Sequence, residues 1–354
     1  RIDRNERDRR TLKTSISTAY LSHSLITTLC LCSRKSIHKL TYVIIVINML
    51  YLIGLGLGDE KDITVKGLEI IKQKCEKVYL ENYTSILSEP DSGESEERDE
   101  NESQRKRMEL FYGKRCEICD RDFVEQNGVE KMLEEAKEKD IAFLVVGDCF
   151  AATTHADLVL RASDRGVNVK VIYNASIMNA CAGSGLQLYN FGKTVSLCFF
   201  TNGWRPDSFY DGIKGNRDLG LHTLILLDIR VKEPTVEALC SGKKIYEPRR
   251  FMTVCTAAKQ MLAVERDRKE RVYDENTRAI AIARVGQDDE RFITCSLKEM
   301  CSLNCGKPLH SLILVGAKTH ELEEKMLKFY EAKKEDFYES DDLVPNQYLE
   351  DFDL

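Results

Sequence analysis

Two apolar segments about ninety residues apart each run without a charge into glycine and then aspartate. The first ends at Gly54-Leu-Gly56-Leu-Gly58-Asp59 and the second at Gly147-Asp148. Alternating glycines let a backbone turn sharply and approach a ligand closely, because no Cβ stands in the way. His155 follows the second segment and could begin a helix or serve a bound ligand. These residue types predict a ligand site at the ends of the two segments.

The spacing of the motifs argues against three familiar sites. A dinucleotide fingerprint needs its third glycine three residues after the second, which residues 57–59 do not supply. Gly192-Lys193-Thr194 resembles the end of a phosphate loop, but Gln187 stands where the first glycine is required. Cys116 and Cys119 have zinc-ligand spacing, and Cys301 with Cys305 could complete four thiolates. Because no second pair of cysteines has the same spacing, we interpret the Cys116 and Cys119 pair as incidental and predict no metal.

The apolar segments themselves indicate buried parallel strands. A strand covered on both faces shows no polar face, and open α/β sheets bind ligands at the carboxyl ends of such strands. The expected strands cover residues 49–54, 78–80, 141–146 and 169–173, with helices at 62–75, 129–138 and 154–165. The ends of three of these strands should converge at residues 54–59, 147–154 and 174–179.

After residue 191 the pattern changes to shorter strands between helices, which predicts a second, mixed αβ domain. Its expected strands cover 195–200, 223–228, 279–285 and 309–315, with helices at 208–216, 253–266 and 322–334. The predicted division is a disordered or spurious leader (1–48), an N-terminal αβ domain (49–190) with a disordered acidic insertion at about 89–106, a C-terminal αβ domain (191–334) and an acidic disordered tail (335–354).

Charge and cysteine usage narrow the class of protein further. The 354 residues carry a net charge of −6, and residues 1–48 hold nine Lys or Arg against three acids, which leaves −12 for the remainder. A protein region with this net negative charge is expected to repel the phosphates of nucleic acid. Thirteen cysteines, odd in number and set in apolar runs, indicate reduced thiols in the cytoplasm. A charge-free run from residue 40 to 58 is long enough to cross a membrane, but Asn48 and the glycines disfavour that interpretation.

Segments spread along the chain, in order, resemble diphthine methyl ester synthase. They include Ala152-Thr-Thr-His-Ala-Asp-Leu158 and Ala283-Arg-Val-Gly286. The full set of matching segments is 49–59, 62–67, 79–85, 143–148, 152–158, 174–179, 185–189, 204–206, 244–248, 283–286 and 308–312. The family belongs to the tetrapyrrole-methylase-like class of S-adenosylmethionine (AdoMet) methyltransferases.

The resemblance implies two αβ domains, a parallel-sheet N-terminal domain and a mixed-sheet C-terminal domain, with AdoMet between them, usually in a homodimer. The implied substrate is translation elongation factor 2, at the histidine that becomes diphthamide, whose added amine is trimethylated and whose carboxylate is esterified. The cofactor contacts implied for this chain fall on Leu57, Asp148, Ala151, Ser176, Ile177, Leu227, Val285 and His310. His155 and Asp148 are candidates to contact the substrate amine or the sulfonium.

Two departures from the family pattern and two alternatives accompany this interpretation. Cys149 and Ala151 replace a proline and a glycine of the family, which adds a Cβ near the cofactor and predicts weaker AdoMet binding. The leader of residues 1–48 has no counterpart in the family. The alternatives are a membrane-tethered, non-catalytic AdoMet or nucleotide-binding protein, and a methylase of the same fold that acts on a tetrapyrrole.

Overall fold

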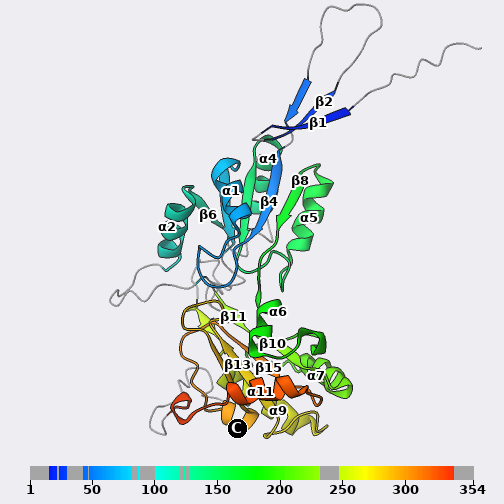
Figure 1. The fold of residues 1–354 in the computed structure, drawn as a ribbon, viewed down its shortest axis with the longest axis vertical. Coiled ribbons are helices and arrows are strands. Elements are labelled where there is room, and N and C mark those ends of the chain that lie inside the picture. Colours follow the sequence, from blue (N-terminus) through cyan, green and yellow to red (C-terminus); the bar gives the residue numbers. More distant parts are fainter. Residues whose placement is uncertain are drawn as a thin grey trace, which may run out of the picture.

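A computed structural model of the chain describes residues 16–21, 24–29, 43–46, 48–81, 87, 100–119, 123, 127–201, 203–231 and 247–338. Two αβ units follow one another along the long axis of the molecule (Figure 1). The predicted fold class, a parallel sheet followed by a mixed sheet, is confirmed.

The N-terminal domain is built on a five-stranded parallel sheet with the order β6-β5-β7-β4-β8. Its strands are β4 (Met49–Gly54), β5 (Lys77–Glu81), β6 (Cys116–Cys119), β7 (Ile141–Val145) and β8 (Asn168–Ile172). Its helices are α1 (Val65–Gln73), α2 (Glu100–Tyr112), α4 (Asn127–Glu138) and α5 (His155–Asp164).

Successive residues of β4 face opposite sides of this sheet, as the pleat of a strand requires. Tyr51 and Ile53 pack with residues of α1 and α2, whereas Leu50 and Leu52 pack with residues of α4 and α5. Both faces of the strand are therefore covered by helices. This explains why β4 appears in the sequence as an unbroken apolar run.

The C-terminal domain holds a mixed sheet with the order β14-β13-β15-β10-β9, in which β9 and β10 are parallel and the other pairs antiparallel. Its strands are β9 (Val195–Leu197), β10 (Thr223–Leu227), β13 (Arg278–Ala283), β14 (Arg291–Ser296) and β15 (His310–Leu314), with a small ribbon of β11 (Ile229–Arg230) and β12 (Arg250–Phe251). Its helices are α7 (Ser208–Leu219), α9 (Val254–Arg268), α10 (Leu297–Met300) and α11 (Glu321–Phe329).

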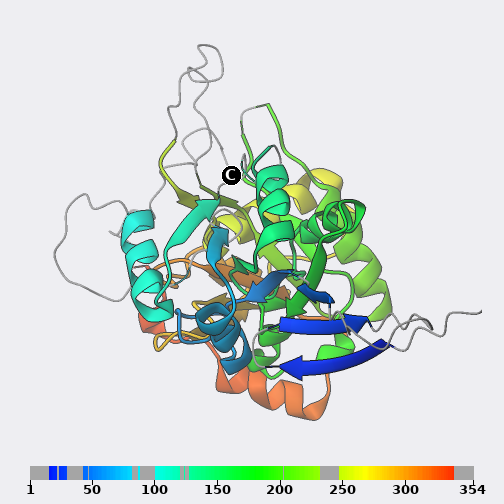
Figure 2. The same ribbon diagram turned by 90° about the horizontal axis from the view of Figure 1, so that it is seen from above.

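A short connection joins the two domains. It comprises α6 (Ile177–Ala180) and the 3-10 turns η1 (Cys181–Ser184) and η2 (Leu188–Asn190). Residues of α7, α9 and α10 pack in one core of the C-terminal domain, and residues of η1 and α11 pack in the other. Seen from above, along the long axis, the two units overlap in projection (Figure 2).

The chain before β4 contains three further strands, β1 (Ile16–Leu21), β2 (Ser24–Leu29) and β3 (Val43–Val46), in a separate antiparallel sheet. The prediction that residues 1–48 are a disordered or spurious leader stays a prediction. The charge-free run at residues 40–58 contains β3 and β4 in the structure. Among the described residues, no helix combines the length and the apolar character that crossing a bilayer requires.

Parts of the predicted disordered insertion and of the predicted disordered tail are folded in the structure. Residues 100–106 belong to α2, in which Arg105 and Glu109 form an i,i+4 ion pair and Met108 is buried in the core. Residues 335–338 are also ordered against the C-terminal domain, since Asp336 pairs with Arg291 and Phe337 packs on the core. The rest of the predicted tail and residues 89–99 of the insertion lie outside the described residues.

The Cys116-Glu-Ile-Cys119 motif forms β6. Residues three apart on a strand face opposite sides, and Cys116 indeed joins the core on one face while Cys119 joins the core on the other. The two thiols therefore cannot bind one metal ion together. Among the described residues no group of three or more potential ligands is placed to hold a metal.

Candidate functional site

The ends of β4, β7 and β8 are hydrogen-bonded to one another, as the sequence predicted. Gly56 and Gly147 exchange two backbone hydrogen bonds, with N···O distances of 3.2 and 2.7 Å. The Asn174 side chain donates from Nδ2 to the carbonyl oxygens of Gly54 and Asp62, both at 3.0 Å. One amide group thus ties the glycine turn to the loop after β8.

The glycines of this turn are required by close approach. A Cβ on Gly54 would lie 2.7 Å from the carbonyl oxygen of Gly147, and Gly56 has a φ of +86°. A Cβ on Gly58 would lie 2.5 Å from the carbonyl oxygen of Gly286, which follows β13 in the other domain. The glycine turn is therefore also a point of contact between the two domains.

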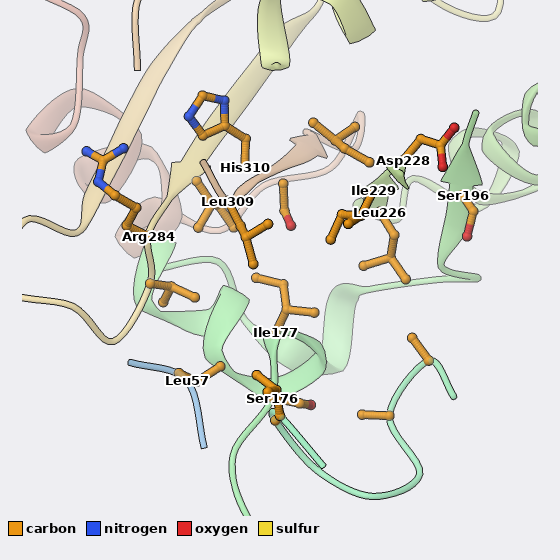
Figure 3. Close-up of a pocket in the computed structure, with 18 of the residues that line it drawn as sticks. Leu57, Ser176, Ile177, Ser196, Leu226, Asp228, Ile229, Arg284, Leu309 and His310 are labelled. Atoms are coloured by element: carbon orange, nitrogen blue, oxygen red, sulfur yellow. The ribbon is translucent and has the colours of Figure 1, made fainter. Parts of the chain in front are cut away.

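A cavity of about 440 Å³ lies where these strand ends meet the C-terminal domain. Figure 3 shows Leu57, Ser176 and Ile177 on one side of it and Leu226, Leu309, His310 and Arg284 on the other. The Ser176 hydroxyl accepts a hydrogen bond from the backbone N–H of Met178 and so caps the short helix α6. The wall thus combines backbone, small side chains and aliphatic side chains from both domains, which is typical of a small-molecule site.

The structure brings seven of the eight predicted cofactor contacts together around this cavity. The seven are Leu57, Ala151, Ser176, Ile177, Leu227, Val285 and His310. Asp148 does not line it. Its Oδ1 accepts a hydrogen bond from the backbone N–H of Phe150 and its Oδ2 one from that of Asn174, both at 3.0 Å. The Asp148 carboxylate therefore shapes the loops around the cavity.

His155, the other candidate for contact with the substrate, is only 1% exposed and does not line the cavity. Its Nδ1 lies 3.0 Å from the carbonyl oxygen of Cys149, to which the Thr153 hydroxyl also donates at 2.6 Å. A carbonyl oxygen only accepts, so Nδ1 carries the hydrogen. The ring also makes an edge contact with Phe143. His155 therefore fixes the loop of residues 149–153 from the buried side, away from the cavity.

The two residues that depart from the family pattern lie on opposite sides of that loop. The Cys149 side chain is fully buried in the core of the N-terminal domain, and burial raises the pKa of its thiol to about 12. Ala151 lines the cavity, and the positive φ of the loop falls on its neighbour Ala152, at +57°. The extra methyl group is therefore at the cavity wall, as expected, whereas the thiol is not.

His310 presents an unused hydrogen-bond acceptor. Its Nε2 lies 2.9 Å from the carbonyl oxygen of Lys307 and must carry the hydrogen, whereas its buried Nδ1 has no partner among the described residues. Burial is the main cause that lowers the pKa of His310 to about 4, and the nearby Arg284 guanidinium contributes in the same direction. The imidazole is therefore neutral at pH 7, with a lone pair on Nδ1.

Sequence reasoning missed several residues of the cavity wall, of which Arg284 and Asp228 are charged. The Arg284 guanidinium donates to the carbonyl oxygens of Cys305 and Lys307 at 2.7 and 2.5 Å and pairs with Asp289 at 2.6 Å. Arg284 also has a φ of +50°, rare for a residue with a side chain. The segment 283–286 was among those that resemble the family, but nothing in the sequence indicated that the Arg284 side chain lines a ligand site.

Asp228 follows β10 on the same wall. Its Oδ2 accepts hydrogen bonds from the backbone N–H of Phe199 and from Nε of Arg230, at 3.0 and 3.1 Å. Both charged residues of the wall are thus already engaged with the protein. The arrangement can hold a ligand by shape, by backbone groups and by the Nδ1 atom of His310.

Comparison with known proteins places this geometry in a family. The family model described as tetrapyrrole (corrin/porphyrin) methylases matches residues 49–301. A protein from Arabidopsis thaliana named as a probable diphthine methyl ester synthase is 54% identical over 286 residues, which is 80% of this chain and 99% of the relative. The diphthine methyl ester synthase of Neurospora crassa is 51% identical over 291 residues, 82% of this chain and 96% of the relative. A crystal structure of diphthine synthase aligns with a TM-score of 0.65 at 31% identity, covering 80% of this chain and 96% of that one.

Proposed function

We propose that this chain, which belongs to the diphthine methyl ester synthases within the tetrapyrrole (corrin/porphyrin) methylase family, methylates the modified histidine of translation elongation factor 2. Membership makes it a methyltransferase of diphthamide biosynthesis whose family uses AdoMet. The proposed reactions are trimethylation of the amine on the modified histidine and formation of a methyl ester at its carboxylate.

The residues around the cavity fit AdoMet. A volume of about 440 Å³ lies in the range of cavities that enclose ligands of this size. Leu57, Ser176 and Ile177 from one domain and Leu227 and Val285 from the other would hold the cofactor between them. When bound, AdoMet supplies a methyl group on a sulfonium, which is an excellent leaving group.

The His310 Nδ1 atom is the observation that carries the fit most directly. It is a buried acceptor without a partner among the described residues. Such an atom destabilises the folded protein unless a ligand donates a hydrogen bond to it. An amino or hydroxyl group of the cofactor would donate to it. Because the imidazole is neutral, His310 would do so without placing a positive charge near a cationic sulfonium.

The work left to the protein is alignment and exclusion of water. An α-amino-type nucleophile has a pKa of about 7.7 to 8.0, so roughly a tenth or more is neutral at cytosolic pH and no strong base is demanded. This agrees with a wall on which Arg284 and Asp228 hold the protein's own groups. Asn174 and Asp148 fix the loops that form the other side.

We further propose a homodimer in the cytoplasm, as the family resemblance predicts. Support for a reducing compartment comes from the ten described cysteines, all of which are free and eight of which are buried. The alternative of a membrane-tethered, non-catalytic protein is not favoured, since the run of residues 40–58 contains strands in the structure. A tetrapyrrole substrate is likewise not favoured, since the relatives that match at half identity are named as diphthine enzymes.

The test is transfer of label to protein. The full chain is incubated with methyl-labelled AdoMet and elongation factor 2 purified from cells that cannot carry out this step. We expect label on the modified histidine, and none on elongation factor 2 that lacks the added aminocarboxypropyl group. Label that appears only on an added tetrapyrrole, or no uptake of AdoMet by calorimetry, would overturn the proposal.

A further inference from the structure

We propose that Phe150 and Tyr173 form an aromatic platform on the rim of the cavity, on which the protein substrate docks. The inference rests on the proposed function, because it assumes that the methyl acceptor is a side chain carried by a folded protein. A protein of that size cannot enter the cavity, so its surface must contact the rim while the modified side chain reaches inside.

The two rings lie together although they come from different elements. Phe150 belongs to the loop after β7, and Tyr173 directly follows β8. Their ring centroids are 6.3 Å apart with planes at 55°, within the usual range for an aromatic pair. Both side chains nevertheless remain partly exposed to solvent, with exposed fractions of 38% for Phe150 and 65% for Tyr173. Two adjacent aromatic rings that remain exposed to this extent are typical of a binding surface.

The platform is continuous with the cavity along both segments. Phe150 precedes Ala151, Ala152 and Thr153, which line the cavity, so its Cα lies one peptide, about 3.8 Å, from the Cα of a wall residue. Tyr173 precedes the wall residue Ser176 by three positions. A partner that rests on the rings therefore holds its nearest side chains within reach of the reaction site.

The backbone beneath the rings is fixed by one side chain. The Asp148 carboxylate accepts from the N–H of Phe150 with one oxygen and from the N–H of Asn174, the residue after Tyr173, with the other. Ordering a surface before binding reduces the entropy lost on association. This gives Asp148, which lies outside the cavity, a defined positioning role.

Other exposed aromatic side chains lack this setting. Tyr189 on η2 and Phe329 on α11 are at least as exposed, but neither lines the cavity nor neighbours a residue that does. Figure 1 shows α11 in the C-terminal domain, whereas the loops after β7 and β8 face the junction of the two domains. Phe329 therefore serves as a matched control for the loss of an exposed aromatic ring.

The experiment compares full-length wild type with Phe150→Ala, Tyr173→Ala, the double variant, Tyr173→Phe and Phe329→Ala. We measure AdoMet affinity by calorimetry, the KM and kcat for elongation factor 2, and its equilibrium binding. Aromatic anchors carry a large share of interface energy, so we expect the double variant to raise KM at least about tenfold with AdoMet affinity unchanged. Tyr173→Phe keeps the ring and should retain the wild-type KM, as should Phe329→Ala.

Each other outcome overturns the inference in a recognisable way. If wild type methylates elongation factor 2 and the double variant has the same KM, the platform does not dock the substrate although the proposed function holds. If the double variant instead dissociates a dimer in sedimentation, or loses binding to anionic lipid vesicles, the rings serve a second copy or a membrane. If wild type neither binds nor methylates elongation factor 2, the proposed function fails and this inference fails with it.

Discussion

The buried imidazole of His310 predicts that acid should destabilise the protein through this one residue. The pKa of His310 is about 4 in the folded chain, against about 6.5 for an ordinary histidine, and burial is the main cause. Between these values the unfolded chain binds a proton that the folded chain excludes, so the free energy of unfolding falls as pH decreases. The loss begins near pH 6.5, is complete below pH 4 and amounts to about 2 kcal/mol at pH 5.

The measurement is urea unfolding of wild type and His310→Gln at pH 7 and at pH 5. Glutamine can donate to the Lys307 carbonyl oxygen but does not titrate, so the advantage of wild type over the variant should shrink by about 2 kcal/mol between the two pH values. His222, whose pKa burial also lowers, is present in both proteins and cancels in the difference. Stability curves that stay parallel from pH 7 to pH 5 would show that the imidazole is not held neutral.

Three further substitutions test the positioning of the site. Gly286→Ala places a Cβ 2.6 Å from that of Leu57 at a φ of +86°, so we expect AdoMet binding to weaken and stability to fall by about 1–3 kcal/mol; Gly113→Ala, with a φ of +67° and nothing within 4 Å, is the control for backbone strain alone. Asn174→Ala removes two hydrogen bonds to backbone carbonyl oxygens and should lower the urea midpoint by the equivalent of about 1–3 kcal/mol, whereas an unchanged midpoint would mean that the loops hold without it. Ala151→Gly removes a methyl group from the cavity wall and should lower the AdoMet Kd at least about fivefold by calorimetry; equal or weaker binding would contradict the view that this methyl group crowds the cofactor.

The strands that form the site could be predicted because their burial on two faces leaves a pattern in the sequence. β4 and β7 are apolar at nearly every position; β4 ends at Gly54, and Gly147 follows two residues after the end of β7. β14 and α2 were missed because neither shows an unbroken apolar run. The four central residues of β14 are buried, but Thr294 interrupts its apolar residues, and α2 is mostly polar, with Met108 and Tyr112 as its buried anchors.

The roles of polar residues near the site could not be read in the same way. Asp148 and His155 were reasonable candidates for contact with a ligand, since each follows a strand that ends at the cavity. Whether a carboxylate points at a ligand or at the amides of its own loop depends on the direction of the backbone after the turn. The pattern of apolar residues does not predict that direction. In the structure both side chains hold the loop of residues 148–153.

Polar side chains that fix the loops around the cavity, and do not contact the ligand, are consistent with the chemistry proposed for the site. A displacement on a sulfonium methyl depends on the distance and angle between two bound partners, and a misplacement of about 1 Å can cost a hundredfold in rate. Asp148, Asn174 and Arg284 each hydrogen-bond to backbone groups next to the cavity, whereas His310 keeps an acceptor for the ligand. It follows that residues without any contact to the cofactor should influence turnover as strongly as those that touch it.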